Sequence, residues 1–117
     1  MMKEFKVVFH LDEDTAGRVN KAINNIRNLL VDLGEENVDI EVVANGTAVN
    51  ALRKSNEGQG HKLAALAKKG VAFAACGNSM KHLEIQASDL VEYTMVVDSG
   101  IGELVKKQSQ GWAYIRP

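Results

Sequence analysis

The one cysteine of the chain, Cys76, has the residue type and the position that most favour chemistry. It follows an apolar run over residues 72–75, which is typical of a buried strand, and it precedes Gly77-Asn78-Ser79, where a helix is expected to begin. Free backbone N–H groups and the positive end of a helix dipole favour a thiolate at such a place. An alternative stays open, in which Cys76 is a small buried hydrophobic residue at a strand end.

Other polar residues follow the remaining predicted strands. His10 closes the first strand and could serve as a base or proton donor for the thiol, although a half-exposed histidine at a strand end has the same pattern. Ligands of open parallel sheets bind beyond the carboxyl ends of the strands, where the winding direction reverses. The candidate catalytic residues are therefore Cys76 and His10. The candidate ligand-binding residues, which all follow a strand, are Asn45, Gly77, Asn78, Ser79 and Ser99.

Five predicted strands and the helices between them must position these residues. Apolar residues recur every three or four positions from Val19 to Leu33, which predicts a long helix that Asp14 caps and Gly34 ends. Shorter helices are expected over residues 47–53, 61–69 and 80–84, and after Ser99. The predicted strands are residues 4–10, 38–44, 71–75, 94–97 and 112–115.

The pattern within each strand predicts its place in the sheet. Strands separated by helices pair in parallel through right-handed crossovers. The second strand alternates apolar residues with Asp39 and Glu41, which indicates one wet face and an edge position, whereas the third and fourth strands lack alternation and belong in the middle. We therefore expect one α/β domain over residues 1–117, a flavodoxin-like three-layer sandwich with a five-stranded parallel sheet of order 2-1-3-4-5.

Composition narrows the classes of function. The chain has 117 residues, 45% hydrophobic and 25% charged, with a net charge of −1, so a globular domain is expected and nucleic-acid binding is not. One cysteine excludes an internal disulfide and a four-cysteine zinc site, and His82 has no common zinc spacing to it, so no metal is expected. The acidic loop Asp12-Glu13-Asp14 would repel a flavin phosphate, so no cofactor is expected. No long apolar run follows the N-terminus, which predicts a cytoplasmic protein without a membrane span.

Five segments together resemble the DsrE/DsrF-like family of small proteins linked to sulfur metabolism, and the resemblance covers nearly the whole chain. The segments are Val7-Val8-Phe9-His10, Ile40-Glu41-Val42-Val43-Ala44-Asn45-Gly46, Ala75-Cys76-Gly77-Asn78-Ser79, Ser99-Gly100-Ile101-Gly102-Glu103-Leu104 and Gly111-Trp112-Ala113-Tyr114-Ile115-Arg116-Pro117. The resemblance implies a flavodoxin-like fold and assembly into trimers or hexamers. It also implies that the cysteine after the third strand, here Cys76, accepts sulfane sulfur as a persulfide, with Asn78 and Ser79 in the loop around the sulfur.

Two classes of function follow. The first is a sulfur carrier or sulfurtransferase subunit with Cys76 as the acceptor and a separate protein as sulfur donor or acceptor. The second is a non-catalytic oligomeric binding or regulatory module of the same fold. A redox-sensing thiol is a third hypothesis, and it needs a resolving cysteine from another molecule. Trp112 and Tyr114 near the C-terminus favour a homo-oligomer because they place apolar surface on an edge element, unless Trp112 packs on its own last helix.

Overall fold

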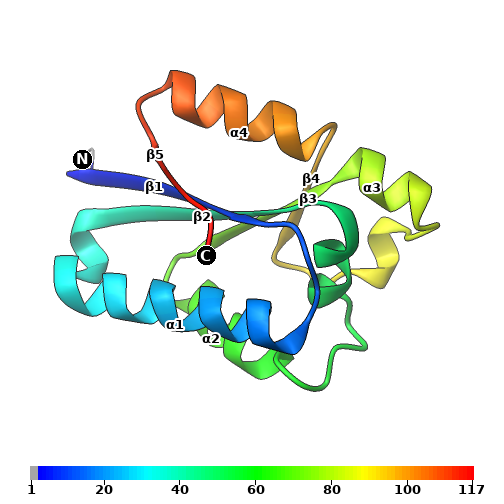
Figure 1. The fold of residues 1–117 in the computed structure, drawn as a ribbon. Coiled ribbons are helices and arrows are strands. Elements are labelled where there is room, and N and C mark those ends of the chain that lie inside the picture. Colours follow the sequence, from blue (N-terminus) through cyan, green and yellow to red (C-terminus); the bar gives the residue numbers. More distant parts are fainter. Residues whose placement is uncertain (1–2) are drawn as a thin grey trace.

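Five parallel strands form the sheet of the computed structural model, which describes residues 3–117 (Figure 1). The strands are β1 (Phe5–Leu11), β2 (Val38–Ala44), β3 (Ala72–Cys76), β4 (Thr94–Val97) and β5 (Ala113–Ile115). Their order across the sheet is β4-β3-β2-β1-β5, and every neighbouring pair is parallel. The predicted five-stranded parallel α/β architecture is confirmed.

Helices cover both faces of the sheet, as a three-layer sandwich requires. The helices α1 (Ala16–Leu33) and α2 (Gly60–Lys68) lie on one face, and α4 (Gly100–Ser109) lies on the other (Figure 1). The short helix α3 (Gly77–His82) continues directly from β3. Three 3₁₀ helices, at Glu35–Asn37, Gly46–Leu52 and Ala87–Asp89, complete the connections. The strands β1 to β4 follow one another in a single direction, so right-handed crossovers place α1 and α2 on the same face.

The strand order differs from the expected 2-1-3-4-5, because β2 lies between β1 and β3 and β5 pairs with β1. The prediction took the acidic residues of β2 as a sign of a wet edge. In the structure Glu41 is only 3% exposed and lies under α4, so alternation here marks a buried polar group in an inner strand. The edges of the sheet are β4 and β5. On β4, which was predicted in the middle because it lacks alternation, Met95 and Val96 are each 49% exposed. The winding direction therefore reverses between β1 and β5, and not between β1 and β3.

The element boundaries agree closely with the apolar periodicity. In α1 the residues that face the sheet recur at helical spacing and are buried: Val19, Ala22, Ile23, Ile26 and Leu30. The helix is capped by Thr15, whose hydroxyl accepts the N–H of Arg18 at 3.4 Å, and not by the predicted Asp14. Gly34 follows its last turn with φ of +92°, as expected for a helix-ending glycine.

Two packed layers hold the sheet between its helices. The larger one fills the space between the sheet and the helices α1 and α2, and it includes Phe9, Ile23 and Phe73. The smaller one lies under α4, where Val8, Val43, Ala74 and Leu104 are buried and Trp112 packs against them. Trp112 therefore packs on its own last helix, which was the alternative to its forming exposed surface for an oligomer. The even-numbered residues of β1 face α4, and this places His10 on the α4 side.

Candidate functional site

The sulfur of Cys76 lies at the beginning of two helices. Cys76 is the N-cap of α3, and its sulfur accepts the backbone N–H of Ser79 at 3.4 Å. The backbone N–H of Gly100, in the first turn of α4, also donates to this sulfur, as does that of Asn78. The residue is 5% exposed. Cys76 is thus the last residue of the buried strand β3 and not, as predicted, the residue after it, and the predicted helix begins directly after Cys76. The first turns of α3 and α4 both lie at this end of the sheet (Figure 1).

These contacts favour the thiolate. Burial by itself would raise the pKa of the Cys76 thiol, because an anion is poorly solvated there. Hydrogen bonds from the Ser79 side chain and from the backbone of Gly100, Ser79 and Asn78 outweigh burial, so the pKa lies below its ordinary value. Cys76 therefore combines low exposure with an environment built for negative charge.

The hydroxyl of Ser79 connects two loops at the sulfur. Its oxygen accepts the backbone N–H of Gly46 at 2.7 Å, which fixes the loop after β2 against α3. The hydroxyl proton is not used in this contact, and the O–H of Ser79 donates to the sulfur of Cys76. The predicted role of Ser79 beside the thiol is consistent with this geometry.

Two glycines allow the close approach of backbone to Cys76. A Cβ atom at Gly77 would lie 2.8 Å from the carbonyl oxygen of Val97, at the end of β4. A Cβ atom at Gly100 would lie 3.0 Å from Cβ of Asn45 and 3.1 Å from Cβ of Cys76. Gly100 is therefore placed between these two residues, and any side chain there would push α4 away from the sulfur.

A second hydrogen-bonded group lies beside the thiol. His10 Nε2 is 2.7 Å from Oδ1 of Asn45, and His10 Nδ1 is 2.6 Å from the hydroxyl oxygen of Tyr114. His10 is the second-last residue of β1, Asn45 follows β2 and Tyr114 belongs to β5, so three neighbouring strands contribute to the group. The side chain of Asn45 borders the same glycine as Cys76, which joins the two parts of the site.

The structure brings most of the predicted residues together, but it separates His10 from the thiol. Because β2 lies between β1 and β3, two strand spacings of roughly 9–10 Å in total separate the positions of His10 and Cys76 across the sheet. Asn78 is exposed, and its backbone N–H is the group that reaches the sulfur. The hydroxyl of Ser99 accepts the N–H of Gly102 at 3.0 Å, so Ser99 caps α4 as predicted.

Tyr114 and Gly100 are the two members of the site that the sequence prediction missed. The expected order placed the last strand beside the fourth, far from His10, whereas β5 pairs with β1 and sets Tyr114 opposite Val8. If the pairing of β5 with β1 had been predicted, Tyr114 would have been expected on the strand next to His10. For Gly100, the signal was present in the segment Ser99-Gly100-Ile101-Gly102, where a serine cap precedes a glycine in the first helical turn.

A buried carboxyl group, that of Glu41, lies under the same helix and faces Glu103 of α4. Oε1 of Glu41 is 3.6 Å from Nζ of Lys107, which also lies 4.5 Å from the centre of the Trp112 ring. Burial, and next a hydrogen bond with the carboxyl of Glu103, raise the pKa of Glu41 to about 7. Oε2 of Glu41 is buried without a hydrogen-bond partner in the described part of the chain, which disfavours the ionised carboxylate and agrees with the raised pKa.

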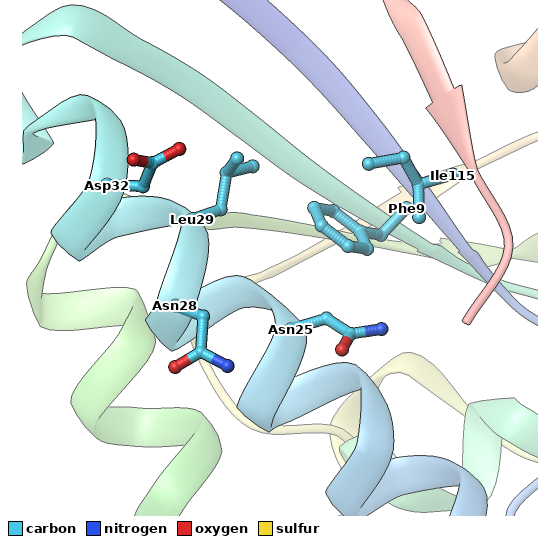
Figure 2. Close-up of a pocket in the computed structure, with 6 residues that line it drawn as sticks. All are labelled: Phe9, Asn25, Asn28, Leu29, Asp32 and Ile115. Atoms are coloured by element: carbon cyan, nitrogen blue, oxygen red, sulfur yellow. The ribbon is translucent and has the colours of Figure 1, made fainter.

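A groove of about 460 Å³ lies on the opposite face of the sheet, between α1 and β5 (Figure 2). Phe9, Leu29 and Ile115 give it apolar walls, and polar side chains of α1, such as Asn25 and Asp32, border it. None of the predicted site residues lines this groove.

Within residues 3–117 no three His, Cys, Asp or Glu side chains gather in a way that could hold a metal ion. No helix of that part is long and apolar enough to cross a membrane.

Comparisons with known proteins give the chain its family. The sequence model of the DsrE/DsrF-like family matches residues 3–117. Protein MTH1491 from Methanobacterium thermoautotrophicum, a protein of unknown function, is similar with 46% identity and a TM-score of 0.92, over 97% of this chain and 99% of that one. No curated protein matches.

Two further solved structures share the fold at low identity. The ychN protein from E. coli has a TM-score of 0.79 at 18% identity, with 97% of this chain and 99% of that chain covered. Protein BT1422 from Bacteroides thetaiotaomicron, conserved and of unknown function, has a TM-score of 0.74 at 16% identity, with 96% and 94% covered. With the family match over nearly the whole length, these findings show that the chain belongs to the DsrE/DsrF-like family.

Proposed function

We propose that this protein is a sulfur carrier that accepts sulfane sulfur on Cys76 as a persulfide. The observation that carries the proposal is the set of donors on the sulfur of Cys76, which come from the first turns of α3 and α4 and lower the pKa of the thiol. A thiolate is the form that attacks a sulfane sulfur. Membership in the DsrE/DsrF-like family supports a role related to sulfur relay.

The transfer needs no outside oxidant or reductant. The Cys76 thiolate attacks the outer sulfur of a donor persulfide or polysulfide, a new S–S bond forms to Cys76, and the S–S bond of the donor breaks. The electron pair of the broken bond leaves with the donor as a thiolate, which takes a proton from solvent. In the second half, a nucleophile on the acceptor attacks the outer sulfur and regenerates the Cys76 thiolate. Because the chain has one cysteine, the acceptor is another molecule or another copy.

The hydrogen-bond donors around Cys76 serve both halves of this cycle. They stabilise the Cys76 thiolate when it attacks the sulfur-donating molecule, and they stabilise the same thiolate when it leaves as sulfur is passed on. His10 lies on the far side of β2 and binds Asn45, so its effect on the sulfur would pass through that amide.

The direct test is incubation of the protein with inorganic polysulfide, followed by intact-mass measurement with and without a thiol reductant. We expect a reductant-sensitive gain of one sulfur atom in the wild type and no gain in Cys76→Ser. Ser88→Ala, at an exposed serine of the 3₁₀ helix Ala87–Asp89, is the matched control and should load normally. No gain in the wild type, or an equal gain in Cys76→Ser, would contradict the proposal.

The low exposure of Cys76, 5%, favours the second candidate function, a binding or regulatory module without sulfur transfer. Thiol titration separates the two. Alkylation at neutral pH that is slow, with an ordinary pKa, would support the module. Fast alkylation with a pKa below the ordinary value would support the carrier.

A further inference from the structure

Three side chains form one hydrogen-bonded series that ends beside Cys76. The series runs from Tyr114 on β5 to His10 on β1 and to Asn45 after β2, with atom separations of 2.6 and 2.7 Å. Both distances are short, and His10 uses both of its ring nitrogens. The orientation of the imidazole is therefore fixed from two sides.

The chemistry of the three groups sets the direction of the hydrogen bonds. Oδ1 of Asn45 can only accept, so Nε2 of His10 carries the proton between them. In the neutral imidazole Nδ1 then accepts the phenolic proton of Tyr114. The series thus runs in one direction, and each bond polarises the next.

The NH₂ group of Asn45, a half-buried residue, is the free end of the series. Its Oδ1 is held by His10, while its Nδ2 donates to none of residues 3–117, so it is available to a ligand. Asn45 continues β2 in extended conformation, so its side chain lies on the α4 side like that of Cys76. The Cβ atoms of both residues lie about 3 Å from the same point beside Gly100.

We propose that this amide binds the outer sulfur of the Cys76 persulfide, and that His10 and Tyr114 are positioning residues that keep its NH₂ group directed there. This inference rests on the proposed function. The donors already described, from Asn78, Ser79 and Gly100, surround the inner sulfur. The outer sulfur lies one bond further out, is anionic at neutral pH, and needs a donor of its own. Asn45 provides one from the neighbouring strand, where facing side chains have Cβ atoms about 5 Å apart.

The test uses the full chain loaded with inorganic polysulfide and follows alkylation of the outer sulfur by a bimane reagent as a function of pH. We expect Asn45→Ala to raise the apparent pKa of the outer sulfur by about one unit, as for the loss of one hydrogen bond to a charged group. Tyr114→Phe, which removes one O–H group, should raise it less.

Histidine variants provide a rescue. His10→Ala should behave like Asn45→Ala, because the amide is then free to turn. His10→Gln places an NH₂ group near the former Nε2 position and should restore most of the wild-type value. Restoration by Gln and not by Ala would show that the donor to Asn45 is the property that matters.

The unloaded thiol separates positioning from general damage. Its pKa, measured with iodoacetamide, should stay at the wild-type value in Tyr114→Phe and His10→Ala, since neither residue donates to the inner sulfur. A parallel rise of both pKa values would overturn the inference, because it would indicate loosening of the whole site. If the wild type loads with sulfur and Asn45→Ala leaves the outer-sulfur pKa unchanged, the inference alone fails. A wild type that gains no sulfur overturns the proposed function and this inference together.

Discussion

The sulfur of Cys76 depends on donors from segments that are far apart in the chain. One group of donors comes from residues 78 and 79, directly after β3, and another from residue 100, which arrives after β4. Each N–H or O–H group stabilises the thiolate and has little effect on the neutral thiol. The pKa of Cys76 therefore measures how well α3 and α4 are seated against the end of the sheet.

Ser79 is the side chain whose removal should be felt most directly by the thiol. We expect Ser79→Ala to raise the apparent pKa of Cys76 by about half a unit to one unit, because one hydroxyl donor to the anion is lost. The pH dependence of iodoacetamide alkylation measures this pKa. Ser109→Ala, at an exposed position at the end of α4, is the control and should leave it unchanged. An unaltered pKa in Ser79→Ala would mean that the hydroxyl does not point at the sulfur.

Two glycines of α4 form a matched pair for a second test. In Gly100→Ala the new Cβ would meet atoms of Asn45 and Cys76 at 3.0 and 3.1 Å, so the helix start must shift away from the sulfur. We expect a loss of about 1–3 kcal/mol in the free energy of unfolding and a higher thiol pKa. In Gly102→Ala the nearest neighbour is 3.4 Å away, and alanine favours a helix by about 0.5–1 kcal/mol over glycine. Urea unfolding and the pH dependence of alkylation should therefore separate the two variants. Equal stability and equal thiol pKa in both would contradict the close contact of Gly100 with Asn45 and Cys76.

At the scale of elements, local patterns predicted the helices and strands well but placed two strands wrongly in the sheet. Strand limits such as 38–44 and 94–97 depend on nearby residues, and they agree with the structure. The lateral order depends on burial against partners distant in sequence. Glu41 looked solvated because the sequence does not show Lys107 and Glu103 packing over it from α4. The same error in strand order concealed Tyr114, while Cys76 needed only its local context.

Glu41 links the seating of α4 to pH. Its ordinary pKa of 4.5 rises to about 7 in the folded protein, first through burial and next through the hydrogen bond with Glu103. Between these values the folded state binds more protons than the unfolded state, so the free energy of unfolding falls as pH rises and levels off above pH 7. Besides these two acids, Lys107 is the charged group that faces this position.

We expect Glu41→Gln to remove this pH dependence, because glutamine stays neutral and keeps the shape of the protonated acid. At pH 8 the variant should be more stable than the wild type by about 1 kcal/mol, since a buried charge is no longer required. Urea unfolding at pH 5, 6, 7 and 8 measures the slope. Asp39→Asn, on the same strand with a half-exposed side chain, should keep the wild-type slope. A wild-type stability that does not fall from pH 5 to pH 7 would contradict the shifted pKa.

At the scale of the whole molecule, the α4 side carries apolar surface that one chain leaves exposed. Ile101 and Val105 lie one turn apart on α4 and are 55% and 58% exposed, and Met95 on the edge strand β4 is 49% exposed. One ten-residue helix covers this face, whereas α1 and α2 cover the other (Figure 1). Such surface is typical of contacts between subunits, and it agrees with the trimer or hexamer that the family resemblance implies.

Sedimentation tests this assembly with variants that leave the core intact. We expect the wild type to sediment as a trimer or hexamer, and the double variant Ile101→Lys/Val105→Lys to shift towards the monomer, because a charge must be desolvated at each contact. Val31→Lys, at a residue of α1 that is 86% exposed, is the matched control and should keep the wild-type mass. A monomeric wild type at micromolar concentration would contradict the assembly. In the proposed sulfur carrier the one thiol passes its sulfur to another molecule, and the rate of sulfur release in the double variant would show whether that acceptor is a neighbouring copy or a separate protein.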